Sequence, residues 1–243
     1  MPAVQEEFRN KKEKIKKELL NHKEISQISQ GIIKIDSDQI TAFRSGTDEK
    51  DGVLLIGGAG CVAHGWCKNR EFKASGWGWL ADEGSAIWVG QKVFQAVLKD
   101  LDGRGPKTLL TKFIVQKFKI RKVEDLTILV YLKTPTEIIP QFSMICDEIS
   151  KKGDRIAKNI LKEAGRELAL NVKPVIEKFD FKKNGFPIVL AGSMFKSKII
   201  LDTVKKEIKK FAPRVKFIRP KVKPVIGAVK LAIEEIQHGG IKS

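Results

Sequence analysis

Two apolar runs flank a glycine-rich turn in VLLIGGAGCVAHGW, residues 53–66. The first run is apolar throughout and ends in glycines, and the second covers Val62–Trp66, so the pattern predicts two strands joined by a tight turn over Gly57–Cys61. A glycine turn exposes backbone N–H groups without a Cβ in front of them, which makes a concavity suited to anions. This hairpin is therefore the first candidate site.

Two further glycine clusters follow along the chain. SGWGWLADEGSAIWVG, residues 75–90, leads into a helix whose apolar face begins at Ile87 and continues to Leu101. GFPIVLAGSMFKS, residues 185–197, predicts a strand over Pro187–Ala191, a turn at Gly192–Ser193 and then a helix. Any one of these turns alone is weak evidence, because glycine turns usually have a structural role.

The rest of the chain alternates helical and strand patterns. A polar, turn-rich break over residues 45–52 predicts a lobe boundary near residue 50. Residues 105–150 look helical and irregular, with no evident chemistry. Helices are predicted over 5–21, 38–44 and 154–176 and after Pro224, with strands over 31–36 and 215–218. This alternation predicts an α/β fold.

The composition and the net charge limit the classes of protein and of partner that this sequence fits. Of 243 residues, 42% are hydrophobic and 31% charged, which is typical of a folded globular protein. The net charge of +17 favours polyanionic partners such as nucleotides, but the densest basic run, KFIRPKVK at 216–223, has no recognition motif, so nucleic acid is not the expected partner. The charged N-terminus and the absence of an apolar stretch of about 18 residues predict a cytoplasmic protein without a membrane span.

The three cysteines, Cys61, Cys67 and Cys146, are too few and too dispersed for a disulfide framework. His64 is the only other metal-ligating side chain between the first two, so buried structural thiols are expected rather than a zinc site. The cysteine usage fits a reducing compartment.

Five segments together resemble the N-acetylglucosamine kinase family and its BadF/BadG/BcrA/BcrD ATPase relatives, within the acetate and sugar kinase, Hsp70 and actin superfamily. They are IDSDQITAFRSGT (35–47), VLLIGGAGCVAHGW, SGWGWLADEGSAIWVG, GFPIVLAGSMFKS and KPVIGAVKLA (223–232). The resemblance implies a ribonuclease H-like actin/sugar-kinase fold in two lobes, with ATP and Mg²⁺ between them and a small sugar as the phosphate acceptor. Residues 1–50 would be the remainder of the N-terminal lobe, and residues 51–243 the C-terminal lobe.

The resemblance also implies roles for residues in the first two segments. Asp38 takes the place of the general base on the acceptor hydroxyl, although spacing alone favours the interpretation that Asp36 and Asp38 simply cap a helix. Gly58, Ala59, Gly60 and Cys61 match the second phosphate loop, which in the family usually reads G-T-G-S. Replacing these hydroxyls by Ala59 and Cys61 is expected to remove donors to a charged oxygen, each worth about 1.5–3 kcal/mol.

Roles in the other segments follow in the same way. Gly76, Trp77, Gly78 and Asp82 correspond to the sugar-binding segment, but Asp82 also sits where an N-cap is expected. Trp77 and Trp79 could instead belong to the core. The loop on the adenosine side of the nucleotide is matched by Gly192, Ser193 and Lys196. If these assignments hold, Ala59, Trp77 and Ser193 should converge on one cleft.

The family's opening D-G-G-G-T-K motif is absent from this sequence, and Met1–Leu20 resembles a helix that normally follows it. The N-terminal lobe is therefore expected to be incomplete, with an unpaired sheet edge and an uncovered apolar face, unless a second copy or a separate chain completes it. Two other functions stay open. One is a nucleotide-binding protein without catalysis, and the other is a BadF-type ATPase activator, although the dispersed cysteines do not favour its iron–sulfur cluster.

Overall fold

The computed structural model describes residues 2–29, 33–132, 135–181 and 185–238. The chain divides into two compact units. The first unit contains residues 1–46 and 221–243, and the second contains residues 47–220. No helix in the described part of the chain is both long enough and apolar enough to cross a membrane.

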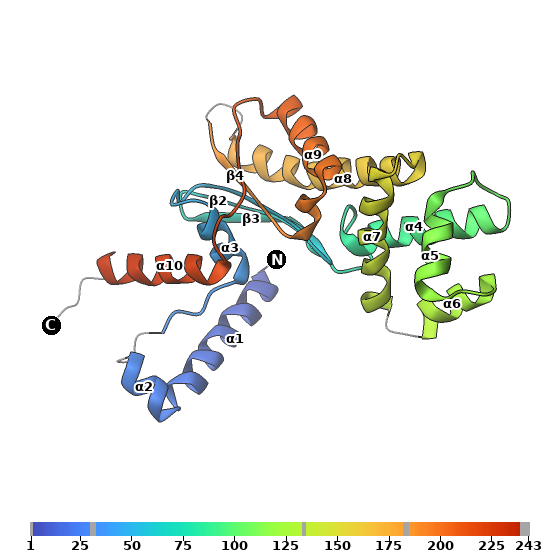
Figure 1. Ribbon diagram of the computed structural model, residues 1–243. Helices are drawn as coiled ribbons and strands as arrows, with labels where there is room; N and C mark the ends of the chain where they lie inside the picture. The colour runs from blue at the N-terminus through green and yellow to red at the C-terminus, as the bar shows by residue number, and fades with distance from the viewer. Residues whose placement is uncertain (1, 30–32, 133–134, 182–184, 239–243) are drawn as a thin grey trace. The chain divides into compact units, whose positions relative to one another are not determined.

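The second unit is built on one five-stranded sheet with the order β3-β2-β1-β4-β5 (Figure 1). Its strands are β1 (Gly52–Gly57), β2 (Cys61–Cys67), β3 (Arg70–Ser75), β4 (Pro187–Ala191) and β5 (Lys216–Ile218). The first three form an antiparallel meander, whereas β4 pairs with β1 and β5 with β4 in parallel. The parallel pairing of β1 and β4 places the C-terminal ends of both strands, and the glycine turns that follow them, at the same edge of the sheet.

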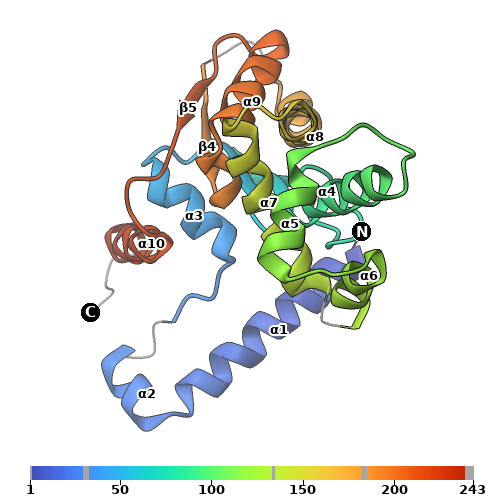
Figure 2. The ribbon, with the colours of Figure 1, turned by 45° about the vertical axis from the view of Figure 1, so that its right-hand side comes forward.

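Helices α8 and α9 lie side by side in Figures 1 and 2, and α8 packs against β1, β2 and β3. The contact of α8 with the sheet is close, because a Cβ on Gly65 would come within 2.3 Å of Val175 in α8. Helix α7 packs on both α4 and α8 and so extends the structure beyond the edge with the glycine turns. The helices are α4 (Ala86–Leu101), α5 (Leu109–Phe118), α6 (Val123–Leu132), α7 (Pro135–Lys151), α8 (Arg155–Phe179), the 3₁₀ turn η1 (Ser193–Lys196) and α9 (Lys198–Phe211).

The first unit consists, in its described residues, of helices alone. Helix α10 packs on α3, and Gly227 permits the close crossing, since a Cβ there would lie 1.9 Å from the Thr41 carbonyl oxygen. Two ion pairs join the segment before and within α3 to α10, Arg44 with Glu234 and Lys34 with Glu235. The helices are α1 (Pro2–Leu20), α2 (Lys23–Ser29), α3 (Asp38–Gly46) and α10 (Pro224–His238).

Most predicted elements are confirmed, among them the hairpin, the long helix α8 and the alternation of strand and helix after Pro187. The strand predicted over 31–36 is wrong for residues 33–36, which form no strand because the described residues of the first unit offer no neighbouring strand to pair with. Gly31 and Ile32 lie outside the described residues. Strand β3 and helix α2 were not predicted.

The division of the chain differs from the predicted domains in one respect. The predicted boundary near residue 50 falls close to the observed division after Gly46, but α10 groups with the first unit rather than with residues 51–220. The physical reason is the tight packing of α10 on α3, which local sequence patterns do not reveal.

Candidate functional site

The turn between β1 and β2 is seated on the beginning of α4. The Gly58 amide donates to the Gly60 carbonyl at 2.9 Å, and the Gly58 carbonyl accepts from the Ala86 amide at 2.8 Å. The Ala59 carbonyl accepts from Ile87 at 3.4 Å. In the part of the chain that the structure describes, the amides of Ala59 and Gly60 donate to no protein group. These two N–H groups therefore remain able to bind an anion.

Asp82 ties this turn to the second glycine cluster. Asp82 is only 5% exposed, and its carboxylate accepts from the amides of Cys61 at 3.3 Å, Gly76 at 3.1 Å and Trp77 at 2.9 Å. The Ser75 hydroxyl lies 3.4 Å from the same carboxylate. The buried Asp82 carboxylate thus connects the turn before β2 to the turn after β3.

The interpretation of Asp82 as an N-cap is wrong. Ser85 caps α4, because its hydroxyl accepts from the Trp88 amide at 3.2 Å. Asp82 lies one turn too early, and its carboxylate is already engaged by the donors of the two glycine turns.

The segment after β3 projects its aromatic side chains outward. Gly76 and Gly78 have φ values of +80° and +106°, which favour glycine, and they turn the chain around Trp77. Trp77 is 77% exposed and Trp79 is 39% exposed, so the interpretation of these rings as core residues is wrong. An exposed indole can stack on an apolar ligand face.

Cys61 faces the interior rather than the outer side of its turn. Its thiol contacts the Glu83 carbonyl at 3.1 Å, and the Asn171 side-chain amide lies 3.4 Å from the sulfur. Burial raises the pKa of the Cys61 thiol to about 11. The expected loss of a hydroxyl donor therefore falls on Ala59 alone, because a serine hydroxyl on the Cys61 rotamer would also face the interior.

The turn after β4 approaches the end of β1 closely. Gly192 has a φ of +105°, and a Cβ at this position would lie 2.2 Å from the Gly57 carbonyl oxygen. The turn continues into η1, which presents Ser193 and Lys196, and then into α9. Only glycine at residue 192 lets the two strand ends meet in this way.

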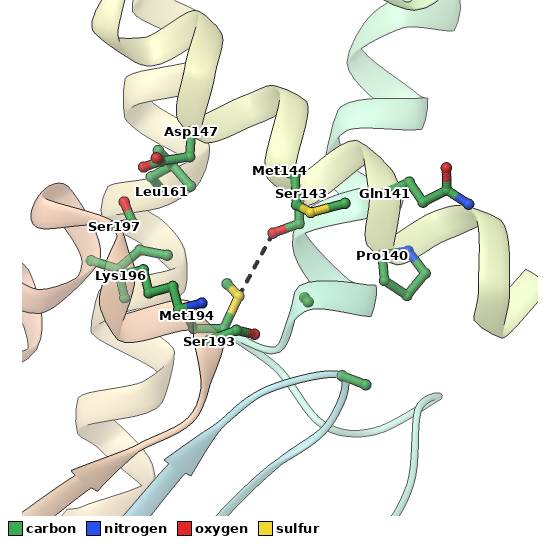
Figure 3. Close-up of a pocket in the computed structure, with 13 residues that line it drawn as sticks. Pro140, Gln141, Ser143, Met144, Asp147, Leu161, Ser193, Met194, Lys196 and Ser197 are labelled. Atoms are coloured by element: carbon green, nitrogen blue, oxygen red, sulfur yellow. Dashed lines mark hydrogen bonds between the residues drawn. The ribbon is translucent and has the colours of Figure 1, made fainter. Parts of the chain in front are cut away.

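A cavity of about 430 Å³ opens where these turns and α7 meet (Figure 3). Three predicted site residues, Ala59, Ser193 and Lys196, line it together although they come from separate turns. Trp77 is not among the lining residues, so the predicted convergence of Ala59, Trp77 and Ser193 holds for Ala59 and Ser193 and is wrong for Trp77 at this cavity. The other lining residues, which were not predicted, are Ala86, Pro140, Gln141, Ser143, Met144, Asp147, Leu161, Met194, Ser197 and Ile200.

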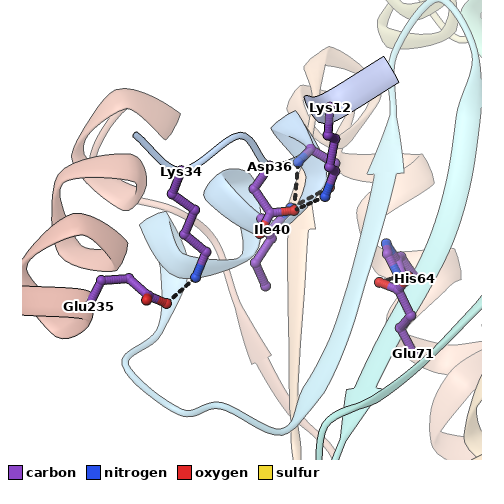
Figure 4. A network of polar contacts seen from close by, with 8 residues as sticks. Lys12, Lys34, Asp36, Ile40, His64, Glu71 and Glu235 are labelled. Atoms are coloured by element: carbon purple, nitrogen blue, oxygen red, sulfur yellow. Dashed lines mark hydrogen bonds and ion pairs between the residues drawn. The ribbon is translucent and has the colours of Figure 1, made fainter. Parts of the chain in front are cut away.

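Asp38 belongs to the first unit, at the first turn of α3. The helix is capped by Ser37, whose hydroxyl accepts from Ile40 at 3.4 Å, while Asp36 accepts from the Ser37 amide and pairs with Lys12 at 3.3 Å (Figure 4). Among the described residues, no side-chain contact of the exposed Asp38 carboxylate is recorded. Asp38 is therefore not the capping group, and its carboxylate can accept a proton or a hydrogen bond from a ligand.

Within the described ranges, no group of three His, Cys, Asp or Glu side chains is arranged to hold a metal ion. Cys61, Cys67 and Cys146 are free thiols and are buried. Burial also raises the pKa of Cys146 well above its usual range, and Cys146 is not among the residues that line the cavity.

Comparisons with known proteins place the chain among sugar kinases. The sequence profile of the BadF/BadG/BcrA/BcrD ATPase family matches residues 10–232. An N-acetylmuramic acid/N-acetylglucosamine kinase of Clostridium acetobutylicum is 33% identical over 209 residues, which cover 84% of this chain and 68% of the relative. An N-acetyl-D-glucosamine kinase of Dictyostelium discoideum is 36% identical over 208 residues, or 82% of this chain and 65% of the relative.

Solved structures agree on the fold. A protein from Chromobacterium violaceum that carries the name N-acetylglucosamine kinase superposes with a TM-score of 0.66 at 19% identity, over 80% of this chain and 64% of that one. Its counterpart from Porphyromonas gingivalis gives a TM-score of 0.60 at 19% identity, over 79% of this chain and 64% of that one. The predicted α/β fold of the ribonuclease H-like sugar-kinase type is confirmed, and the chain spans about two thirds of the length of these relatives.

Proposed function

The chain belongs to the BadF/BadG/BcrA/BcrD ATPase family, and from this membership we propose that it transfers the γ-phosphate of ATP to a hydroxyl of an amino sugar. The observation that carries the proposal is the convergence of Ala59, Ser193 and Lys196 on one cavity. Its volume of about 430 Å³ lies within the range of small-ligand pockets, roughly 300–1,000 Å³. N-acetylglucosamine, or a related amino sugar, is the proposed acceptor, because both curated relatives are named for it.

The phosphates of ATP would lie against the turn over Gly58–Cys61. The Ala59 and Gly60 amides donate to no group in the described part of the chain, and Ala59 and Lys196 line the cavity, where Lys196 would add a positive charge. Gly192 and Ser193 would contact the nucleotide between this turn and α9. Mg²⁺, when bound with ATP, would neutralise charge on the β- and γ-phosphates, and it commonly uses the phosphates with only one or two carboxylates as ligands.

Asp38 is the proposed general base, because it is an exposed carboxylate with no recorded side-chain contact among the described residues. Gly76, Trp77 and Gly78 are the proposed sugar contacts, with the exposed Trp77 ring as a stacking surface. The Asp82 carboxylate fixes the position of this segment by accepting hydrogen bonds from the Gly76 and Trp77 amides. Since four donors already surround its carboxylate, we propose that its influence on the sugar acts through the position of the segment.

The first unit would need a partner to cover one face of α10. Val225, Val229, Ile233 and Ile236 recur at helical spacing and are 61%, 48%, 48% and 57% exposed. We propose that this stripe packs against a separate chain. Light scattering of the purified chain tests this, since a mass twice 27.3 kDa would indicate a homodimer instead.

The kinase proposal is tested by incubating the full chain with ATP, Mg²⁺ and N-acetylglucosamine or N-acetylmuramic acid and detecting sugar phosphate by mass spectrometry. We expect a phosphorylated amino sugar and no phosphorylated glycerol in a matched control. A second candidate, nucleotide binding without transfer, is favoured by the missing hydroxyl at Ala59. It predicts that ATP raises the thermal midpoint while no sugar phosphate forms.

A further inference from the structure

Helices α5 and α6 form a small apolar groove, separate from the candidate site. Figures 1 and 2 show the two helices next to each other, and a cavity of about 260 Å³ opens between the end of α5 and one face of α6. Its lining residues are Phe118, Lys119, Ile120, Asp125, Ile128, Leu129 and Leu132. The volume lies below the roughly 300–1,000 Å³ of small-ligand pockets, so the groove suits a few side chains better than a cofactor.

The walls of this groove are exposed, while its floor is anchored in the core. Ile128 and Leu132, four residues apart on one face of α6, are 52% and 80% exposed. Phe118 is half-buried and packs edge-to-face on the fully buried Phe142 of α7, with ring centroids 5.4 Å apart. Exposed aliphatic side chains beside a recessed aromatic ring are typical of a surface that buries the apolar side chains of a partner.

The segment between the two helices is fixed by its own hydrogen bonds. The chain leaves α5 through Lys119, whose φ is +54°. The Asp125 carboxylate then accepts from the amides of Arg121 and Lys122, at 2.8 and 2.9 Å. A groove that is already formed has little conformational freedom to lose when a partner binds.

Positive charge surrounds the groove and decides which partner fits. Four exposed cations alternate with or follow the lining residues of the α5 end, namely Lys117, Lys119, Arg121 and Lys122. A partner with carboxylates beside its apolar residues complements this rim. A second copy of the chain, with its net charge of +17, complements it poorly, and a flat lipid surface would leave the floor of the groove uncovered.

We propose that the groove between α5 and α6 binds a partner protein through an acidic segment that carries apolar anchor residues. One or two large apolar side chains would fill the space between Phe118, Ile128 and Leu132, and neighbouring Asp or Glu residues would face the cations of the rim. The anchors would supply most of the affinity, and the charges would speed the encounter. Because the groove shares no lining residue with the cavity at the glycine turns, the partner would leave that cavity open.

The experiment selects binders of the full chain from a phage-displayed library of short random peptides and measures their affinities by fluorescence anisotropy. We expect the selected peptides to combine Leu, Phe or Trp with Asp or Glu. The double variant Ile128→Gln with Leu132→Gln should bind them at least about tenfold more weakly, because both walls lose their apolar surface. Arg121→Gln with Lys122→Gln should weaken binding more at low salt than at high salt.

Leu170→Gln is the matched control, because Leu170 is 58% exposed on α8 and lies outside the groove. It should leave the peptide affinities unchanged, and the double variant should keep the thermal midpoint and any sugar phosphorylation of the wild-type chain. Selected peptides without acidic residues, peptides that bind the double variant as well as wild type, or no selected peptide at all would overturn the proposal.

Sedimentation with vesicles of phosphatidylserine and phosphatidylcholine tests the lipid alternative. We expect wild type and the double variant of Ile128 and Leu132 to bind these vesicles equally, through general charge attraction. A loss of vesicle binding in the double variant, with peptide binding unaffected, would assign the groove to a membrane surface and overturn the proposal.

Discussion

The two units of the chain differ in whether a β-sheet holds their elements in place. The second unit has a five-stranded sheet, and the ends of β1 and β4 hold the glycine turns in fixed positions through Gly57, Gly192 and Asp82. In the described residues, the first unit has no sheet and consists of helices, with an apolar stripe of α10 exposed. A nucleotide site can therefore be held by the packing of the second unit alone.

The same difference assigns different parts of the proposed reaction to the two units. In that proposal, the second unit would provide the cavity and the amides that bind phosphate, whereas the first unit would provide the Asp38 carboxylate. Loss of function in the first unit should then affect turnover without affecting nucleotide binding. All four tryptophans lie between Trp66 and Trp88, so tryptophan fluorescence reports on the second unit alone.

The largest effect is expected from Asp38→Asn. Removing a general base should lower the rate of sugar phosphorylation by roughly 10²- to 10⁴-fold, while the affinity for ATP stays within about twofold of wild type. Steady-state kinetics and calorimetry together measure this split. Asp36→Asn is the control, because Asp36 lies two residues earlier and its carboxylate is engaged by the Ser37 amide and by a surface pair with Lys12. Equal rates for Asp38→Asn and Asp36→Asn would show that Asp38 is not the general base and that the first unit takes no part in phosphate transfer.

A smaller loss, of stability instead of rate, is expected from Asp82→Ala in the second unit. It leaves the amides of Cys61, Gly76 and Trp77 without their shared acceptor and should lower the free energy of unfolding by about 3 kcal/mol. Urea unfolding followed by tryptophan fluorescence measures the loss. Asp51→Asn serves for comparison, because Asp51 accepts from one exposed amide, that of Lys68, at the other end of the hairpin. Similar losses in both variants would mean that Asp82 does not hold the turns.

The sequence predicted most of the second unit because its elements have strong local patterns. The β1–β2 hairpin is two apolar runs around glycines, and α8 repeats apolar residues at helical spacing over 25 residues. Strand β3, REFKAS, was not predicted because it is a charged edge strand and its own sequence pattern does not indicate a strand. Its strand conformation depends on the pairing with β2.

The candidate site was predictable only in part, for the same physical reason. Glycine turns leave a local signature, so Ala59 and Ser193 could be named from the sequence. The role of Asp82 depends on donors from residues 61, 76 and 77, which come together only when the sheet forms. Likewise, the contribution of α7 to the cavity is a property of packing, and no local pattern marks it.

A moderate loss of stability, confined to the first unit, is expected from Glu234→Ala. Its carboxylate pairs with Arg44, whose side chain is 3% exposed, so the substitution removes one partner of a buried guanidinium. We expect a loss of about 1–2 kcal/mol in the stability of the first unit. Circular dichroism should detect helix loss at lower urea, while the tryptophan transition should keep its midpoint. A tryptophan midpoint that falls as much as the helical signal would show that the two units unfold together.

The smallest effect is expected from Glu235→Ala, one residue further along α10. Glu235 pairs with Lys34, but the two side chains are 54% and 46% exposed, so water screens the pair and side-chain ordering offsets part of the attraction. The expected change in the helical transition is below about 0.5 kcal/mol. Because Glu234 and Glu235 share a helix and a charge and each pairs with a cationic side chain, the difference between the two variants compares a buried pair with Arg44 to an exposed pair with Lys34. A loss in Glu235→Ala as large as that in Glu234→Ala would mean that α10 is held to the first unit by charge rather than by its packing on α3.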